Sequence, residues 1–271
     1  MPCLSGPRWK KENTLGASRN ELRELSSQID ALFDLGKREE AAILLNKAIV
    51  DSADDGAYNL FFLGEAAGYL ERDGKKQKSY LLQAYHVEEN DPYIVKNLGV
   101  YYLINDSERK SIKLFDKAIE LDPNDFESFR NKGLALSNLG REKKAMEWFA
   151  KAIAINPSDY DAIRQTGISL SKLGKDVEAI EWFRKALLVN ENDYDSMRQL
   201  GISLAMLGKY ETAVGVLKLA LSVNPNDYES KRNLGLVLRK MSGEGETVVS
   251  RMLNYLGRKL ASAWRRLINQ L

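Results

Sequence analysis

A glycine recurs every 34 residues through much of this chain, and this period restricts the possible folds more than any other feature of the sequence. The recurring residues are Gly99, Gly133, Gly167, Gly201 and Gly235. A fixed period between about 20 and 50 residues is typical of a stack of small units rather than of one globular core. The chain is therefore expected to form an array, of which residues 126–159 are one complete copy.

Each unit is expected to hold two helices joined by a turn. In residues 126–139, apolar side chains stand at helical spacing, which predicts the first helix. Gly140 follows, at a place where a residue with positive φ closes a helix without steric cost. The second helix is expected at residues 142–155, because Pro157 cannot continue it.

Two further sets of residues recur inside the units for separate physical reasons. The small residues Gly133, Ala145 and Ala152 allow two antiparallel helices to approach closely, and Phe149 fills the space between them. An aspartate precedes each first helix, where its carboxylate can cap free backbone N–H groups. These predicted N-caps are Asp91, Asp125, Asp159, Asp193 and Asp227.

In length and in the order of small and large positions, these units resemble the tetratricopeptide repeat (TPR) family. The resemblance covers about residues 22–241 and implies an all-α fold, a right-handed α-solenoid of helix-turn-helix repeats. Six full repeats and a partial seventh are expected, at residues 22–55, 57–91, 92–125, 126–159, 160–193, 194–227 and 228–241. Because the usual role of this family is to bind other proteins, the resemblance implies a protein-binding scaffold.

Basic residues gather at the two ends of the chain. The formal net charge is +2, to which residues 1–20 contribute +3 and residues 228–271 contribute +6, which leaves −7 for the array between them. Residues 1–20 hold proline and small polar residues without an apolar run suited to a signal peptide, and predict a disordered basic tail. Cys3 is the only cysteine, which excludes an intrachain disulfide and favours a cytoplasmic protein.

After a break in the pattern, residues 246–271 predict one amphipathic helix. Arginines line one face, and the other face carries Val249, Leu253, Leu256, Leu260, Trp264, Leu267 and Leu271. A helix that caps the exposed end of the array is the favoured interpretation. A seam for self-association or a partner helix and peripheral contact with an anionic membrane surface stay open as alternatives.

Two polar residues recur side by side at the fifth and sixth positions of five successive units. In the TPR family the first helices line the inside of the superhelix, so these positions are expected to face a concave groove. The basic row is Lys96, Arg130, Arg164, Arg198 and Arg232, and the amide row is Asn97, Asn131, Gln165, Gln199 and Asn233. Carboxamides can pair with any peptide backbone, and guanidinium groups bind carboxylates. We predict that these ten residues bind an extended, partly acidic peptide.

The basic row also has a structural alternative. Four of its members follow an acidic residue by three positions, and such local ion pairs contribute only about 0.2–0.5 kcal/mol each. The acidic residues are Glu127, Asp161, Asp195 and Glu229, whereas Tyr93 precedes Lys96. Stability alone gives no evident reason to keep cations in a row within about one Debye length of each other, so the binding interpretation is favoured.

The ninth positions of the same units are aliphatic. They are Val100, Leu134, Ile168, Ile202 and Leu236. TPR domains that hold the carboxy-terminal tails of chaperones carry asparagine there beside a basic fifth position, so this chain is not expected to bind such tails. The aliphatic row predicts an apolar floor in the groove, and hence a ligand with both acidic and apolar residues.

The sequence offers little that could support catalysis. With one histidine and one cysteine, it predicts no metal cluster and no Cys–His nucleophile pair, so we expect neither a cofactor nor an enzyme. The leading hypothesis is a non-enzymatic protein-interaction scaffold, and the alternative is assembly or membrane-surface docking through residues 246–271. Recognition of RNA by helical repeats is a further alternative, against which the charge of −7 argues.

Overall fold

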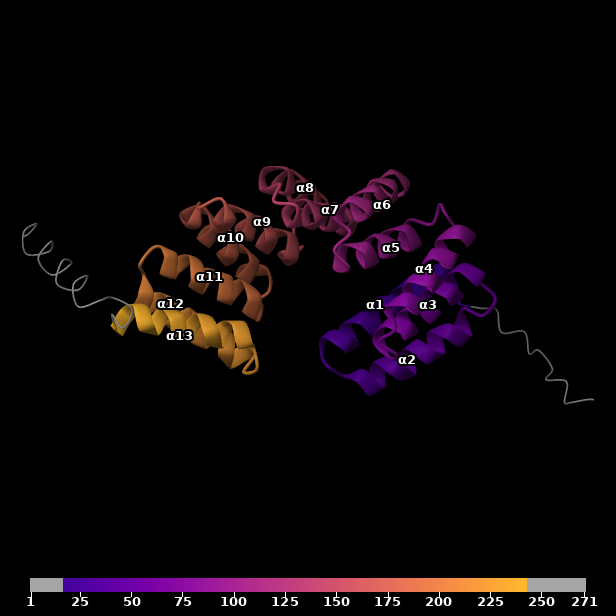
Figure 1. Ribbon diagram of the computed structural model, residues 1–271, viewed down its shortest axis with the longest axis horizontal. Helices are drawn as coiled ribbons and strands as arrows, with labels where there is room; N and C mark the ends of the chain where they lie inside the picture. Colours follow the sequence, from indigo (N-terminus) through magenta and orange to yellow (C-terminus); the bar gives the residue numbers. More distant parts are fainter. Residues whose placement is uncertain (1–16, 243–271) are drawn as a thin grey trace, which may run out of the picture. The chain divides into compact units, whose positions relative to one another are not determined.

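The computed structural model describes residues 17–242, which form thirteen α-helices and no strand (Figure 1). The helices are α1 (Arg19–Asp34), α2 (Arg38–Asp51), α3 (Gly56–Tyr69), α4 (Gly74–Val87), α5 (Pro92–Ile104), α6 (Glu108–Leu121), α7 (Phe126–Asn138), α8 (Glu142–Ile155), α9 (Tyr160–Lys172), α10 (Asp176–Val189), α11 (Tyr194–Met206), α12 (Tyr210–Val223) and α13 (Tyr228–Ser242). Each of the six full repeats contributes two helices, and the partial seventh contributes α13. The predicted all-α array of helix pairs is confirmed.

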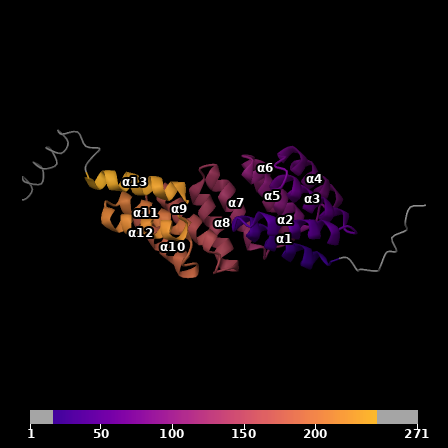
Figure 2. The ribbon, with the colours of Figure 1, turned by 90° about the horizontal axis from the view of Figure 1, so that it is seen from below.

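The described helices belong to two compact units, α1–α7 in the first and α8–α13 in the second. Within each unit, helices that follow one another in the chain pack against each other as hairpins, as Figures 1 and 2 show. Helix α5 also contacts α7 in the first unit, and α11 contacts both α9 and α13 in the second. The first helices α5 and α7 therefore lie side by side in the first unit, as α9, α11 and α13 do in the second.

Three of the recurring glycines, Gly99, Gly167 and Gly201, lie directly against a side chain of the second helix of their repeat. A Cβ added to Gly99 would lie 2.8 Å from the ring of Phe115, and one added to Gly167 would lie 2.7 Å from the ring of Phe183. Both rings are fully buried. The small and large positions predicted from the sequence thus form the core of each repeat.

Glycine and aspartate end and begin the helices as expected. Gly140 and Gly174 have φ of 70° and 74°, and the N–H of Lys175 closes helix α9 by donating to the carbonyl oxygen of Leu170 at 2.9 Å. At helix N-termini, the carboxylate of Asp91 accepts the N–H of Tyr93 at 2.9 Å. The same capping occurs at Asp159 and Asp227.

Asp125 and Asp193 also stand at helix N-caps, but their carboxylates accept hydroxyl groups. Ser128 donates to Asp125, and Ser196 donates to Asp193, in both cases at 2.6 Å. A serine hydroxyl three residues into the helix therefore takes the place of the backbone donor at these two caps.

The start of the array differs from the prediction. Helix α1 begins at Arg19, inside the range 1–20 predicted to be a disordered tail. The reason is a capping box, in which the carboxylate of Glu21 accepts the N–H of Ser18 at 2.7 Å and the Ser18 hydroxyl accepts the N–H of Glu21. The rest of the predicted tail and the predicted helix at 246–271 lie outside the described residues. Along residues 17–242, every helix is too short or too polar to cross a membrane.

Candidate functional site

The predicted polar rows lie on the first helices of the repeats. Lys96 and Asn97 belong to α5, and Arg130 and Asn131 to the neighbouring α7, in the first unit. The second unit holds Arg164 and Gln165 on α9, Arg198 and Gln199 on α11, and Arg232 and Asn233 on α13. Because these helices contact one another in order within a unit, each unit brings its own polar pairs together on one face.

In the second unit, Arg164 and Arg198 are each held by at least two acidic residues. Nη1 of Arg164 lies 2.7 Å from Oδ1 and 2.9 Å from Oδ2 of Asp193, the N-cap of the next first helix. Arg164 also pairs with Asp161 in its own helix. Arg198 repeats this arrangement with Asp227, at 2.9 Å, and with Asp195. Each guanidinium group therefore joins its own helix to the N-cap of the next first helix.

Lys96 makes the same link in the first unit. Its Nζ lies 3.4 Å from Oδ1 of the N-cap Asp125 and also pairs with Glu127. Lys96 is only 9% exposed. Burial works against a charged Glu127, but Lys96 and Arg130 hold the pKa of this carboxyl below its ordinary value. At the other end of the array, Arg232 differs because its side chain is 60% exposed and pairs with Glu229 at 3.3 Å.

These ion pairs give the basic row a structural role. Although burial disfavours the charge on Arg164, Asp161, Asp193 and Asp195 together hold its pKa above the ordinary value. The expectation that stability gives no reason for this row is therefore wrong. The sequence did contain a signal, because four cations of the row stand 29 residues before an N-cap aspartate: Lys96 before Asp125, Arg130 before Asp159, Arg164 before Asp193, and Arg198 before Asp227. Lys96, Arg164 and Arg198 donate hydrogen bonds to these aspartates.

The amide row, in contrast, keeps most of its hydrogen-bonding capacity. No described residue forms a hydrogen bond with the side-chain amide of Asn131, Gln165, Gln199 or Asn233, and all four residues are partly buried. Asn97 donates from Nδ2 to the carbonyl oxygen of Tyr93 at 2.9 Å. Each unbonded amide offers two donors and one acceptor to a ligand.

A pocket of about 410 Å³ lies beside this row in the second unit, between α11 and α13. Its lining includes the ninth-position residues Ile202 and Leu236 and the amide of Asn233. Leu236 is 48% exposed. An apolar floor and an unbonded amide therefore meet in one concave site.

Comparisons with known proteins agree with this architecture. Residues 97–125 and residues 114–147 match two family models described as tetratricopeptide repeat. The chain is a tetratricopeptide repeat protein. TPR proteins are in general non-enzymatic scaffolds for protein–protein interaction. Within the described part of this TPR protein, no cluster of histidine, cysteine, aspartate and glutamate is suited to hold a metal ion.

Solved structures share this fold at low sequence identity. The TPR protein TTC0263 of Thermus thermophilus is 16% identical, with a TM-score of 0.59 over 67% of this chain and 98% of that one. PilF of Pseudomonas aeruginosa is 17% identical, with a TM-score of 0.58 over 79% and 97% of the two chains. MamA from Desulfovibrio magneticus is 20% identical, with a TM-score of 0.54 over 64% and 98%. A search of curated proteins by sequence finds no match.

Proposed function

We propose that this TPR protein is a non-enzymatic scaffold that binds an extended, partly acidic segment of a partner protein along the first helices of its repeats. The observation that supports the proposal most is the unbonded amide row, with Gln165, Gln199 and Asn233 on three helices that contact in succession. A peptide laid across α9, α11 and α13 would meet one amide on each helix. Such contacts hold a backbone without specifying its side chains.

The apolar floor supplies the second part of the binding energy. Ile168, Ile202 and Leu236 occupy the ninth positions of the same three helices. Burial of apolar surface contributes about 25 cal/mol per Å², and each net hydrogen bond about 0.5–1.5 kcal/mol. A ligand is therefore expected to place apolar side chains on this floor while its backbone meets the amides.

The contribution of the arginines is limited by their resident partners. Arg164 and Arg198 already bind two acidic residues each, so a ligand carboxylate would have to share a guanidinium group with them. Arg232 is the most exposed of the three and pairs with Glu229. Acidic residues of the ligand are therefore expected to contribute most near α13.

The test removes the amides and leaves the ion pairs in place. Peptides that bind the intact chain are first selected from a displayed random library, and their affinities are measured by calorimetry. The triple variant Gln165→Ala, Gln199→Ala, Asn233→Ala is expected to bind them at least about tenfold more weakly. Asn192→Ala with Asn226→Ala is the matched control, since both residues are exposed and lie between helices. Equal affinities of the triple variant and the intact chain would overturn the proposal.

Assembly or membrane-surface docking through residues 246–271 stays a prediction, because this segment lies outside the described residues. Deletion of 246–271 tests it by vesicle sedimentation and by the oligomeric state of the remaining chain.

A further inference from the structure

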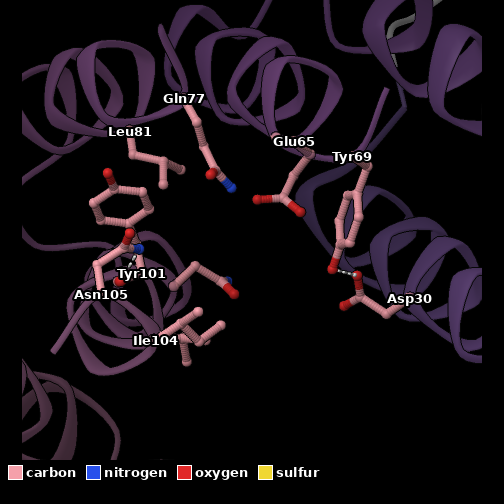
Figure 3. Close-up of a pocket in the computed structure, with 11 residues that line it drawn as sticks. Asp30, Glu65, Tyr69, Gln77, Leu81, Tyr101, Ile104 and Asn105 are labelled. Carbon is pink, nitrogen blue, oxygen red and sulfur yellow. Dashed lines mark hydrogen bonds between the residues drawn. The ribbon is translucent and has the colours of Figure 1, made fainter. Parts of the chain in front are cut away.

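The first unit contains a second concave site, which does not include the basic row. This pocket has a volume of about 270 Å³ and lies among α1, α3, α4 and α5 (Figure 3). Its polar lining consists of Asp30, Glu65, Tyr69, Gln77, Asn97, Tyr101 and Asn105. Figure 3 shows the carboxylate of Glu65 and the amide of Gln77 pointing into the same open space.

The two carboxylates of this pocket occupy equivalent places in their repeats. Asp30 stands at the ninth position of the first repeat, and Glu65 at the ninth position of the second. From Val100 onward the ninth position is aliphatic. The row that forms an apolar floor in later repeats is therefore acidic in the first two.

Neither carboxylate forms a direct ion pair with a described residue. The Tyr69 hydroxyl donates to Oδ1 of Asp30 at 3.1 Å, whereas no described residue forms a hydrogen bond or ion pair with Glu65. The charges of Asp34 and Glu127 raise the pKa of Asp30 further, and that of Lys96 lowers it. That lysine already pairs with Glu127 and Asp125.

Burial makes this arrangement costly for two negative charges. Glu65 is partly exposed as a residue, but its carboxyl group is buried. Desolvation, the larger cause, and repulsion from Asp30, the smaller, raise the pKa of Glu65 to about 8. Desolvation likewise raises the pKa of Asp30 to about 6. A positive charge in the pocket would relieve both effects.

The second repeat is built differently from its neighbours at this point. It is one residue longer than the others, and Gln77 replaces the usual alanine. A Cβ added to Gly68 would lie 2.5 Å from Nε2 of Gln77, so Gly68 makes room for this amide. The polar wall thus depends on two residues of the same repeat.

We propose that this pocket binds a basic side chain, lysine or arginine, of a peptide partner. Asp30 and Glu65 would share its charge, and the aromatic side chains of Tyr69 and Tyr101 line the same pocket, where a ring can attract a cation. A peptide fits better than a free cation because the sixth-position Asn97 and the ninth-position Val100 also line the pocket. This site goes beyond the proposed function, since it uses acidic residues of the first unit and needs none of the amides of the second.

The test uses blocked pentapeptides with arginine, lysine or the neutral isostere citrulline at the centre of four glycines, and free propylguanidinium as a further probe. Binding to the full chain is followed by NMR at neutral pH through the ring signals of Tyr69. The arginine or the lysine peptide is expected to saturate these signals, and to bind at least about tenfold more tightly than the citrulline peptide. It should also bind more tightly than propylguanidinium.

Two variants separate the site from a general charge effect. Glu65→Gln keeps the shape of the side chain and is expected to weaken binding of the basic peptide at least about tenfold. Glu24→Gln removes an exposed carboxylate of α1 outside the pocket and should leave binding unchanged. The triple amide variant of the second unit should also bind the basic peptide normally, whether or not the proposed function holds.

Three results would overturn the proposal. The first is an absence of saturable binding of both basic peptides, and the second is equal binding by the chain with Glu65→Gln. The third is propylguanidinium binding as tightly as the arginine peptide, which would show that the pocket takes a free cation rather than a peptide side chain.

Discussion

Arg164 and Arg232 occupy the same position of their repeats but differ in their surroundings. Arg164 bridges Asp161 and the buried Asp193 with a side chain only 15% exposed, whereas that of Arg232 is 60% exposed. Removal of the Arg164 side chain takes a guanidinium group from the buried carboxylate of Asp193, whereas removal of the Arg232 side chain affects only an exposed ion pair. The contribution of each arginine to stability therefore depends on whether a buried N-cap aspartate of the next first helix lies beside it.

Alanine substitution should separate these two roles. Arg164→Ala is expected to lower the free energy of unfolding by about 2–4 kcal/mol, because Asp193 stays buried without its guanidinium. Arg232→Ala should cost less than about 0.5 kcal/mol, as exposed ion pairs usually do. Urea denaturation measures both changes. Similar losses for the two variants would contradict the structural role assigned to Arg164.

The acidic pocket predicts a particular dependence of stability on pH. The pKa of Glu65 is raised from 4.5 to about 8 on folding, so the folded state binds its proton more tightly than the unfolded state. This contribution is present below the unfolded pKa and is lost as pH rises through the folded pKa. The contribution of Glu65 to the free energy of unfolding should therefore fall between about pH 5 and about pH 8, by at most about 1.4 kcal/mol per pH unit.

Glu65→Gln provides the measurement. The amide does not titrate, so the fall in the denaturation midpoint between about pH 5 and about pH 8 should become shallower than in the intact chain. Glu24→Gln should leave the profile unchanged. Parallel profiles for the intact chain and Glu65→Gln would show that this carboxyl keeps an ordinary pKa in the folded protein.

At the scale of the helix pair, the recurring glycine sets how closely two helices approach. Gly167 lies against the ring of Phe183, whereas nothing lies within 4 Å of a Cβ added to Gly235. Gly167→Ala is expected to destabilise the protein by about 1–3 kcal/mol through overpacking. Gly235→Ala should instead be neutral or stabilising by up to about 1 kcal/mol, because alanine favours a helix. Thermal unfolding of the two variants tests this, and equal shifts would contradict it.

Helix positions could be predicted closely because one pattern repeats along the chain. The expected helices at 126–139 and 142–155 agree with α7 and α8 within a residue, since glycine, proline and aspartate mark their ends. The start of α1 was missed because its capping box, Ser18 with Glu21, is local to the first repeat. Periodic signals therefore predict the interior of the array better than its start.

Individual functional residues were harder to predict, since their environment depends on neighbouring repeats. The rows could be read from the sequence, but Arg164 of α9 pairs with Asp193, the N-cap of α11, and this contact depends on how the two helices pack. Asp30 and Glu65 occupy the ninth positions of the first two repeats, which the sequence shows. That their carboxyl groups are buried follows only from the packing of the helices around the pocket. The binding role of the ten row residues remains a prediction.

In the molecule as a whole, most contacts join neighbouring helices, so stability should be distributed locally. Gly99→Ala places a methyl against Phe115 in the first unit, as Gly167→Ala does against Phe183 in the second. Each variant should reduce hydrogen-exchange protection mainly in its own unit. Equal loss of protection in both units for either variant would indicate that the whole chain unfolds as one cooperative body.

The central claim is that the amide row binds a partner's backbone. The most direct measurement is the affinity of a selected peptide for the chain with Gln165, Gln199 and Asn233 replaced by alanine, beside the control with Asn192 and Asn226 replaced. The account predicts at least about a tenfold loss for the first variant and none for the second. Unchanged affinity in the first variant, with its fold intact by circular dichroism, would contradict the claim.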